Sequence, residues 1–411
     1  MASYPLPVFY DLEQTLSTKK ERKSMFSNYG RPPKAPVRSA PVRRIYSVYK
    51  DEAPKPVSFR EGSDQSFITG SPLYSSKKGT YFEQCYEIES RLGEGDFGEV
   101  FKVVSKENGK HYACKRNILK FRGERDRTRR IQEVKNHEQL TPHVNIIKFY
   151  RAWEENNQLY LLTEVCKQSL ADILYNTHEF PENQIWAYFI DILQGLDHLH
   201  LHKCIHMDVK PENIFIGLDG RCKLGDFGLV IDFSNGYPTE ALDGDSKYLA
   251  PECLQRVYTP AADIFSLGIV LLEMATDLDL PKRGPLWHEL RTGHIPSMEG
   301  RGLSLELRST IKWLMEPDYR KRPTTTEVLN YKAVKRLSRK NNVIYFFRSK
   351  VQTFNSYISK FFILPFIFCS FIYVNLKKKL LNYEEKCYHY QRLDTQWLSW
   401  WTILISPMMS P

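Results

Sequence analysis

The stretch that most constrains this chain is His206-Met207-Asp208-Val209-Lys210-Pro211-Glu212-Asn213, which is followed thirteen residues later by Asp226-Phe227-Gly228. Carboxylate and amide oxygens are the ligands that Mg²⁺ prefers, so we predict that Asn213 and Asp226 are metal ligands. Asp208 is the candidate base for an attacking hydroxyl, and Lys210 could hold positive charge against a phosphoryl group in transfer. Two spaced motifs of this length argue against a chance match among polar loop residues.

A glycine-rich segment upstream predicts the phosphate-binding part of the same site. Apolar residues interleaved with glycines over 86–104 indicate two antiparallel strands joined by a glycine loop. Glycines let the backbone come close to phosphate oxygens and present N–H groups to them. The pattern is weak alone, but a lysine on the next predicted strand strengthens it, because it can pair with the α- and β-phosphates of ATP. The residues predicted to bind ATP here are Leu92, Gly93, Gly95, Gly98, Val100, Ala113 and Lys115.

The segment over 126–140 contains no Gly or Pro and carries Ile131 and Val134 on one helical face, which predicts a helix. Glu133 on this helix is the first candidate for an ion pair with Lys115, and Glu138 is the second.

Two apolar runs over 146–165 flank a polar turn at 154–157 and predict a pair of strands that leads into a hinge. Thr163 would line the back of the nucleotide pocket, and backbone groups near Glu164 and Cys166 would pair with adenine. Cys166 could equally be a small apolar residue with no reactive role.

Charge is distributed unevenly along the chain. Residues 1–80 carry 14 basic and 7 acidic side chains, residues 81–336 carry 34 and 38, and residues 337–411 carry 10 and 3. A mildly acidic centre argues against nucleic acid as a partner, and the basic flanks are free to meet an anionic membrane or an acidic protein. Residues 1–79 hold nine of the 23 prolines and no sustained periodicity, so we expect a disordered regulatory segment.

The segment 337–411 is predicted to be a separate basic and apolar tail. Residues 361–376 are uncharged and would span about 24 Å as a helix, short of the roughly 30 Å hydrocarbon core. Residues 397–409 begin with tryptophans, which favour the membrane interface. A short membrane span, two segments dipping into one leaflet and a mis-predicted gene end remain alternatives.

Residues 81–336 resemble the eukaryotic protein kinase domain, and more narrowly the Wee family and its membrane-associated tyrosine- and threonine-specific (Myt) branch. The resemblance rests on the stretches already quoted and on Gly244-Asp245-Ser246-Lys247-Tyr248-Leu249-Ala250-Pro251-Glu252. It implies a bilobal α+β fold over 80–336, with a small β-rich lobe at about 80–165 and a large helical lobe at about 167–336.

The resemblance also implies a function. The substrate would be the mitotic cyclin-dependent kinase with its cyclin, phosphorylated on adjacent Thr and Tyr residues of its own ATP loop and thereby held inactive before mitosis. The cytoplasmic face of endoplasmic reticulum and Golgi membranes is the implied location, with the cytoplasm or nucleus as the alternative. A different Ser/Thr kinase, such as a translation-initiation stress kinase, and a kinase-fold scaffold that tethers its partner are the competing hypotheses.

Met207 departs from the general kinase pattern, in which an arginine precedes the catalytic aspartate. Without that guanidinium there is no partner for an activation-segment phosphate, so we expect activity without phosphorylation of that segment. Glu252 is expected to pair with Arg322 and to brace the large lobe.

Overall fold

The computed structural model describes residues 18–20, 53–60, 65–95, 98–117, 120–238, 241, 243–298 and 302–360. The chain forms two compact units, Met1–Tyr345 and Phe346–Pro411, and the elements described below belong to the first unless stated otherwise.

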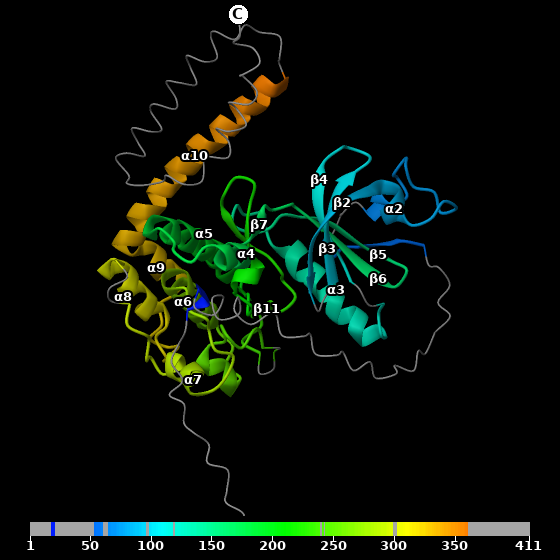
Figure 1. The fold of residues 1–411 in the computed structure, drawn as a ribbon. Coiled ribbons are helices and arrows are strands. Elements are labelled where there is room, and N and C mark those ends of the chain that lie inside the picture. Colours follow the sequence, from blue (N-terminus) through cyan, green and yellow to red (C-terminus); the bar gives the residue numbers. More distant parts are fainter. Residues whose placement is uncertain are drawn as a thin grey trace, which may run out of the picture. The chain divides into compact units, whose positions relative to one another are not determined.

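A six-stranded antiparallel sheet with strand order β1-β5-β6-β4-β3-β2 forms the small lobe (Figure 1). Its strands are β1 (Lys55–Val57), β2 (Tyr86–Gly95), β3 (Gly98–Ser105), β4 (His111–Arg116), β5 (Phe149–Glu155) and β6 (Gln158–Thr163). The predicted strand pair over 86–104 and the predicted turn at 154–157 are both confirmed. The register sets Val100 opposite Lys115 and Ala113 opposite Thr163, which gathers four predicted nucleotide-site residues on neighbouring strands.

Alternate residues of β5 and β6 serve two cores on opposite faces of this sheet, as the two-residue period of a strand requires. On one face Trp153 stacks on Tyr160 with ring centroids 5.0 Å apart, and α2 (Tyr81–Cys85) adds further aromatic rings. On the other face Ala152 packs with Ile131 of α3 (Glu124–Gln139). The helix predicted over 126–140 is therefore confirmed, and it lies beside the sheet (Figure 1). Glu133 on this helix reaches Lys115 on β4.

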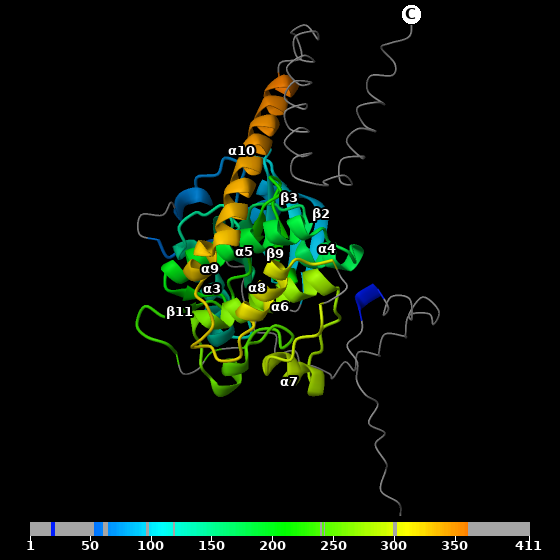
Figure 2. The ribbon, with the colours of Figure 1, turned by 90° about the vertical axis from the view of Figure 1, so that its left-hand side faces the viewer.

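The large lobe is built around α5 and α6, which contact each other, while α8 packs on α6 and α9 on α5 (Figure 2). Its helices are α4 (Leu170–Asn176), α5 (Glu182–Leu201), α6 (Pro260–Thr276), α7 (Pro285–Arg291), α8 (Leu305–Leu314) and α9 (Thr325–Asn330). Short strands and 3-10 turns connect them: β7 (Gln168–Ser169), β8 (Cys204–Ile205), η2 (Pro211–Asn213), β9 (Ile214–Ile216), β10 (Cys222–Leu224), β11 (Ile231–Asp232) and η3 (Pro251–Gln255).

Helix α10 (Lys332–Lys360) follows α9; it begins in the first unit and continues into the second.

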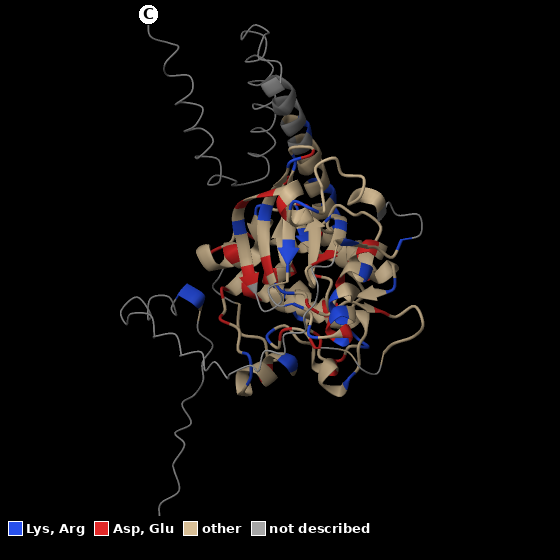
Figure 3. Cartoon of the chain, turned by 90° about the vertical axis from the view of Figure 1, so that its right-hand side faces the viewer, with Lys and Arg blue, Asp and Glu red and all other residues tan. Residues whose placement is uncertain are grey.

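Basic and acidic residues are interspersed over the described part of the chain in the view of Figure 3. The bilobal α+β fold is confirmed.

Part of the segment predicted to be disordered over 1–79 is structured. β1 pairs with β5, the turn η1 (Gln65–Phe67) follows, and Ile68 is buried in the aromatic core of the small lobe. The prediction failed there because three residues containing a proline carry no strand signal of their own, and pairing with β5 decides their conformation.

The apolar tail segments 361–376 and 397–409 lie outside the described residues, as do Asp96 and Phe97 of the glycine loop. Among the helices of the described residues, none is long and apolar enough to cross a membrane. The domain limits at 79–80 and 336–337 remain a prediction.

Candidate active site

Three charged side chains from separate elements meet between the two lobes. The Nζ atom of Lys115 on β4 lies 2.7 Å from Oε1 of Glu133 on α3 and 3.7 Å from Oδ2 of Asp226, two residues beyond β10. Glu133, the first candidate, is therefore the residue that pairs with Lys115. Glu138, the second, faces away and accepts hydrogen bonds from the Ser58 hydroxyl and the Phe59 N–H.

Lys115 and Asp226 shift each other's pKa values toward the charged forms. The Lys115 ammonium holds the pKa of Asp226 below its usual value, against the opposing effect of burial. Burial alone would lower the pKa of Lys115, but Asp226 and then Glu133 outweigh it and raise that pKa. Burial also raises the pKa of Glu133, which Lys115 only partly offsets. At neutral pH the site therefore holds a charged lysine beside an ionised Asp226.

Asp208 is buried, and both of its carboxylate oxygens have partners. Oδ2 accepts a hydrogen bond from Asn213 Nδ2 at 2.7 Å and lies 2.7 Å from Lys210 Nζ. Oδ1 accepts the main-chain N–H of Asp245 at 3.0 Å. Burial would lower the pKa of Lys210, but its hydrogen bond to Asp208 and the charge of that carboxylate raise it, so Lys210 remains charged. These contacts orient the Asp208 carboxylate.

The backbone before Asp208 is fixed by a side chain that the sequence analysis did not single out. Asp263 on α6 accepts the N–H of His206 at 2.8 Å and the N–H of Met207 at 2.9 Å. It also contacts His200 Nε2 at 2.8 Å. Met207 has a φ of +65°, a left-handed conformation that β-region strands and helices do not use, and these bonds hold it there. A buried acid at the start of an otherwise apolar helix was the signal that could have revealed this role.

Gly244 lets the segment after the Asp-Phe-Gly motif approach this backbone. A Cβ atom at that position would clash with the Met207 carbonyl oxygen and would lie 2.8 Å from Asp208 Oδ1. Glycine is therefore required for the Asp245 N–H to reach the Asp208 carboxylate. The predicted brace between Glu252 and Arg322 is confirmed, with the two guanidinium nitrogens 2.6 and 3.1 Å from the carboxylate oxygens.

The predicted hinge follows β6. The Glu164 carboxylate accepts the N–H of Lys148 at 2.7 Å and lies 2.9 Å from Lys223 Nζ on β10, so the hinge side chain joins both lobes. Burial raises the pKa of the Cys166 thiol to about 12. In the glycine loop, Leu92 is exposed at a β-bulge that precedes Gly93.

Phe227 joins the Asp-Phe-Gly motif to α3. Its ring is fully buried, 4.4 Å from the His137 ring, and its carbonyl oxygen accepts Nδ2 of Asn136 at 2.9 Å. Burial lowers the pKa of His137 to about 4, so the ring is neutral and its Nε2–H donates to the Ile147 carbonyl oxygen at 2.6 Å. The helix that carries Glu133 and the segment that carries Asp226 are thus held as one block.

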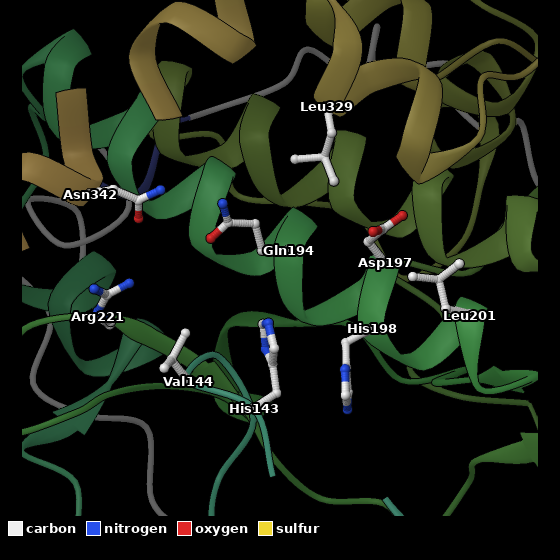
Figure 4. Close-up of a pocket in the computed structure, with 9 residues that line it drawn as sticks. All are labelled: His143, Val144, Gln194, Asp197, His198, Leu201, Arg221, Leu329 and Asn342. Atoms are coloured by element: carbon white, nitrogen blue, oxygen red, sulfur yellow. The ribbon is translucent and has the colours of Figure 1, made fainter. Parts of the chain in front are cut away.

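A separate hollow of about 430 Å³ lies between α5 and the segment that joins α3 to β5 (Figure 4). None of its lining residues is a candidate site residue; they are His143, Val144, Gln194, Asp197, His198, Leu201, Arg221, Leu329 and Asn342. The His143 and His198 rings stack 4.6 Å apart, and burial lowers the pKa of His143 to about 4.

The protein kinase domain family matches residues 86–334, which is more than half of the chain. The chain belongs to the protein kinase family. A kinase domain implies ATP as the phosphoryl donor, so the nucleotide predicted from the glycine loop and Lys115 is the one expected of this family.

Three relatives narrow the family assignment. The membrane-associated tyrosine- and threonine-specific cdc2-inhibitory kinase of Drosophila melanogaster is 45% identical over 290 residues, 69% of this chain and 54% of that protein. The membrane-associated tyrosine- and threonine-specific cdc2-inhibitory kinase wee-1.3 of Caenorhabditis elegans is 42% identical over 327 residues, 79% of this chain and 47% of that protein. The Wee1-like protein kinase 1-A of Xenopus laevis is 33% identical over 293 residues, 65% of this chain and 50% of that protein. This kinase chain spans about half the length of the curated relatives it matches, and the predicted resemblance to the Wee family is confirmed.

Proposed function

We propose that this protein kinase transfers the γ-phosphoryl group of ATP to threonine and tyrosine hydroxyls of the mitotic cyclin-dependent kinase, and so inhibits it before mitosis. Two sets of contacts carry the proposal. Lys115 pairs with Glu133 and Asp226. The Asp208 carboxylate is held by Asn213, Lys210 and the Asp245 N–H. The substrate rests on the names of the relatives, which are tyrosine- and threonine-specific cdc2-inhibitory kinases.

Asp226 and Asn213 fit the Mg²⁺ that the phosphates of ATP require. The Asp226 carboxylate is ionised, because Lys115 lowers its pKa. Asn213 uses its Nδ2 to donate to the Asp208 carbonyl and carboxylate oxygens, which orients its amide and leaves Oδ1 as the oxygen suited to a hard cation. When bound, Mg²⁺ neutralises phosphate charge during transfer.

The remaining residues supply orientation and the proton acceptor. Lys115, held by Glu133, would pair with the α- and β-phosphates of ATP, and backbone groups at Glu164 and Cys166 would bind adenine. As the substrate oxygen bonds to the γ-phosphorus and the bond to the β,γ-bridging oxygen breaks, Asp208 takes the hydroxyl proton. Lys210, 2.7 Å from Asp208, places positive charge against the phosphoryl group. A lysine here is typical of Ser/Thr-type catalytic loops; tyrosine activity is supported by the relatives' names.

We also propose that the tail over 337–411 brings the kinase domain of about 80–336 to the cytoplasmic face of endoplasmic reticulum or Golgi membranes, through 361–376 and 397–409. The relatives' names, which call them membrane-associated, support this. Sedimentation with membrane vesicles tests it: a protein ending near residue 337 should stay in the supernatant while the full chain pellets. Equal pelleting of both would refute the role of the tail.

An Asp226→Asn variant distinguishes catalysis from tethering. It should bind an ATP-site ligand yet lose the ability to inhibit the cyclin-dependent kinase with its cyclin, because the proposed metal ligand is gone. Binding of a fluorescent ATP analogue serves as the control for an intact pocket. If the variant still inhibits its partner as the parent does, the scaffold hypothesis replaces the catalytic one.

A further inference from the structure

A short segment far upstream of the kinase domain contacts the end of α6. The Lys19 N–H donates to the Asp277 carbonyl oxygen at 2.8 Å, and the Lys20 N–H donates to the Asp277 carboxylate at 3.1 Å. Thr18 forms an antiparallel bridge with Leu278. The Lys19 ammonium lies 2.6 Å from Oε1 of Glu273, whose side chain is only 4% exposed. The backbone and the Lys19 side chain of this segment thus both contact the carboxyl end of α6.

The chemistry of this site explains why it takes a lysine. Glu273 is a carboxylate in the core of the large lobe, and a buried carboxylate without a countercharge is strongly disfavoured. Burial raises the pKa of Glu273, and the Lys19 ammonium opposes that rise. The site also lies at the carboxyl end of the 17-residue helix α6, where free carbonyl groups attract positive charge. Asp277, the C-cap residue, is braced by His178 at 3.1 Å.

Glu273 also contacts the segment that lies beside Asp208. Its Oε2 accepts the hydroxyl of buried Tyr248 at 2.8 Å. The Tyr248 N–H donates to the Asp245 carbonyl oxygen at 3.0 Å, and the Asp245 N–H donates to Asp208 Oδ1. A continuous set of contacts therefore joins Lys19 to the turn that orients Asp208.

We propose that the acidic end of α6, formed by Glu273 and Asp277, is a docking site for a lysine-bearing segment, and that the chain's own residues Thr18–Lys20 occupy it in cis. Docked Lys19 supplies the countercharge for Glu273, which anchors Tyr248 and orders the turn at 245–249. The N-terminal segment is then an intramolecular latch on the segment next to Asp208. Release of the latch loosens that turn while the lobe itself stays folded.

Hydrogen exchange of the full chain tests the latch, with Lys19→Met as the variant and Lys20→Met as its matched control. Lys20 pairs only loosely with Glu179, at 3.9 Å between side chains that are 70% and 91% exposed. In Lys19→Met, exchange of the amides at 18–20 and at Tyr248 and Leu249 should accelerate by about tenfold or more, because a buried carboxylate loses its partner. The control should match the parent within about twofold. Unchanged exchange of these amides in Lys19→Met would overturn the proposal.

Limited trypsin digestion tests the same contact with a variant of its partner on α6, Glu273. In Glu273→Gln the amide can still accept the Tyr248 hydroxyl, but it has no charge for Lys19, so cleavage after Lys19 should be about tenfold faster than in the parent. Glu179→Gln is the control and should leave the cleavage rate unchanged. If Glu273→Gln does not fold, the Lys19→Met measurement decides alone. Equal cleavage in a folded Glu273→Gln protein would contradict docking. Neither readout uses kinase activity, so failure here is distinguishable from failure of the proposed function.

Discussion

Asp208 owes its orientation to three donors that come from different parts of the chain. Asn213 and Lys210 come from its own loop, while the Asp245 N–H comes from the segment that Gly244 allows to approach. A carboxylate held on both oxygens is pre-oriented for its substrate before any substrate binds.

Replacement of Asp208 by Asn keeps the shape of the side chain but removes the proton acceptor. We expect kcat to fall by on the order of 10²–10⁴, with little change in ATP binding, because general base catalysis contributes about that much. Single-turnover phosphoryl transfer to a protein substrate measures the first quantity and ATP-analogue titration the second. Glu212→Gln, an exposed acid of the same loop, is the control and should retain activity. Comparable turnover by Asp208→Asn would refute the role given to Asp208.

The thiol of Cys166 should be unreactive even though it lies in the hinge. Its raised pKa of about 12 leaves very little thiolate at pH 8, and only part of this loss is offset by the higher intrinsic nucleophilicity of a basic thiolate. We expect iodoacetamide to alkylate it at least about thirtyfold more slowly than in the denatured chain, with reactivity rising as the pH is raised. Peptide mass spectrometry follows the site. Equal rates in folded and denatured protein would contradict a raised pKa of this half-buried thiol.

At the scale of elements, α3 and the Asp-Phe-Gly segment are joined by one amide. Asn136→Ala removes the donors to the Phe227 carbonyl at 2.9 Å and the Val230 carbonyl at 3.2 Å. We expect the free energy of unfolding to fall by about 1–3 kcal/mol, since a buried carbonyl is left unpaired. Urea denaturation measures the loss. Gln139→Ala, an exposed site on the same helix, should change it by less than about 0.5 kcal/mol. A neutral Asn136→Ala would mean that the two elements are not coupled there.

The connection between η3 and the loop before α9 depends on a fully buried ion pair. Arg322→Met strands the Glu252 carboxylate and should lower the free energy of unfolding by about 3–5 kcal/mol. The matched control is Arg320→Met, because Arg320 is exposed and its guanidinium lies against the side chain of the neighbouring Tyr319. Chemical denaturation of both variants should show a loss in the first alone. Equal stability of the two would remove the structural role of Arg322.

Periodic elements could be predicted from the sequence because their apolar faces are local patterns. Helix α3 covers nearly all of the segment over 126–140 that was predicted to be helical, and the strands around the glycine loop follow their alternation. β1 could not be predicted, because only its partner β5 makes Lys55–Val57 a strand. The role of Asp263 was missed for a related reason. Its hydrogen-bond donors, the N–H groups of His206 and Met207, come from a loop more than fifty residues away in the sequence. The sequence left two acids, Glu133 and Glu138, as candidate partners of Lys115. The packing of α3 against the sheet brings Glu133 to Lys115.

For the whole molecule, Met207 and the Asp245 contact predict a kinase that is active as synthesised. The Asp245 N–H reaches Asp208 through the close approach that Gly244 allows, and Met207 is buried in the apolar core and offers no guanidinium to a phosphate. Treatment of the purified full chain with a protein phosphatase, followed by removal of the phosphatase, should leave kcat unchanged. Loss of activity together with an intact ATP site would show that phosphorylation is required.

The central claim is that the kinase acts on a particular pair of residues, and mapping of phosphosites tests it most directly. A catalytically dead mitotic cyclin-dependent kinase bound to its cyclin would be incubated with the full chain, Mg²⁺ and ATP, with the Asp208→Asn variant in parallel. The account predicts phosphate on the adjacent Thr and Tyr of the partner's ATP loop, and none with the variant. Phosphate at other sites alone, or only on an unrelated basic protein, would contradict it and leave a Ser/Thr kinase with a different substrate.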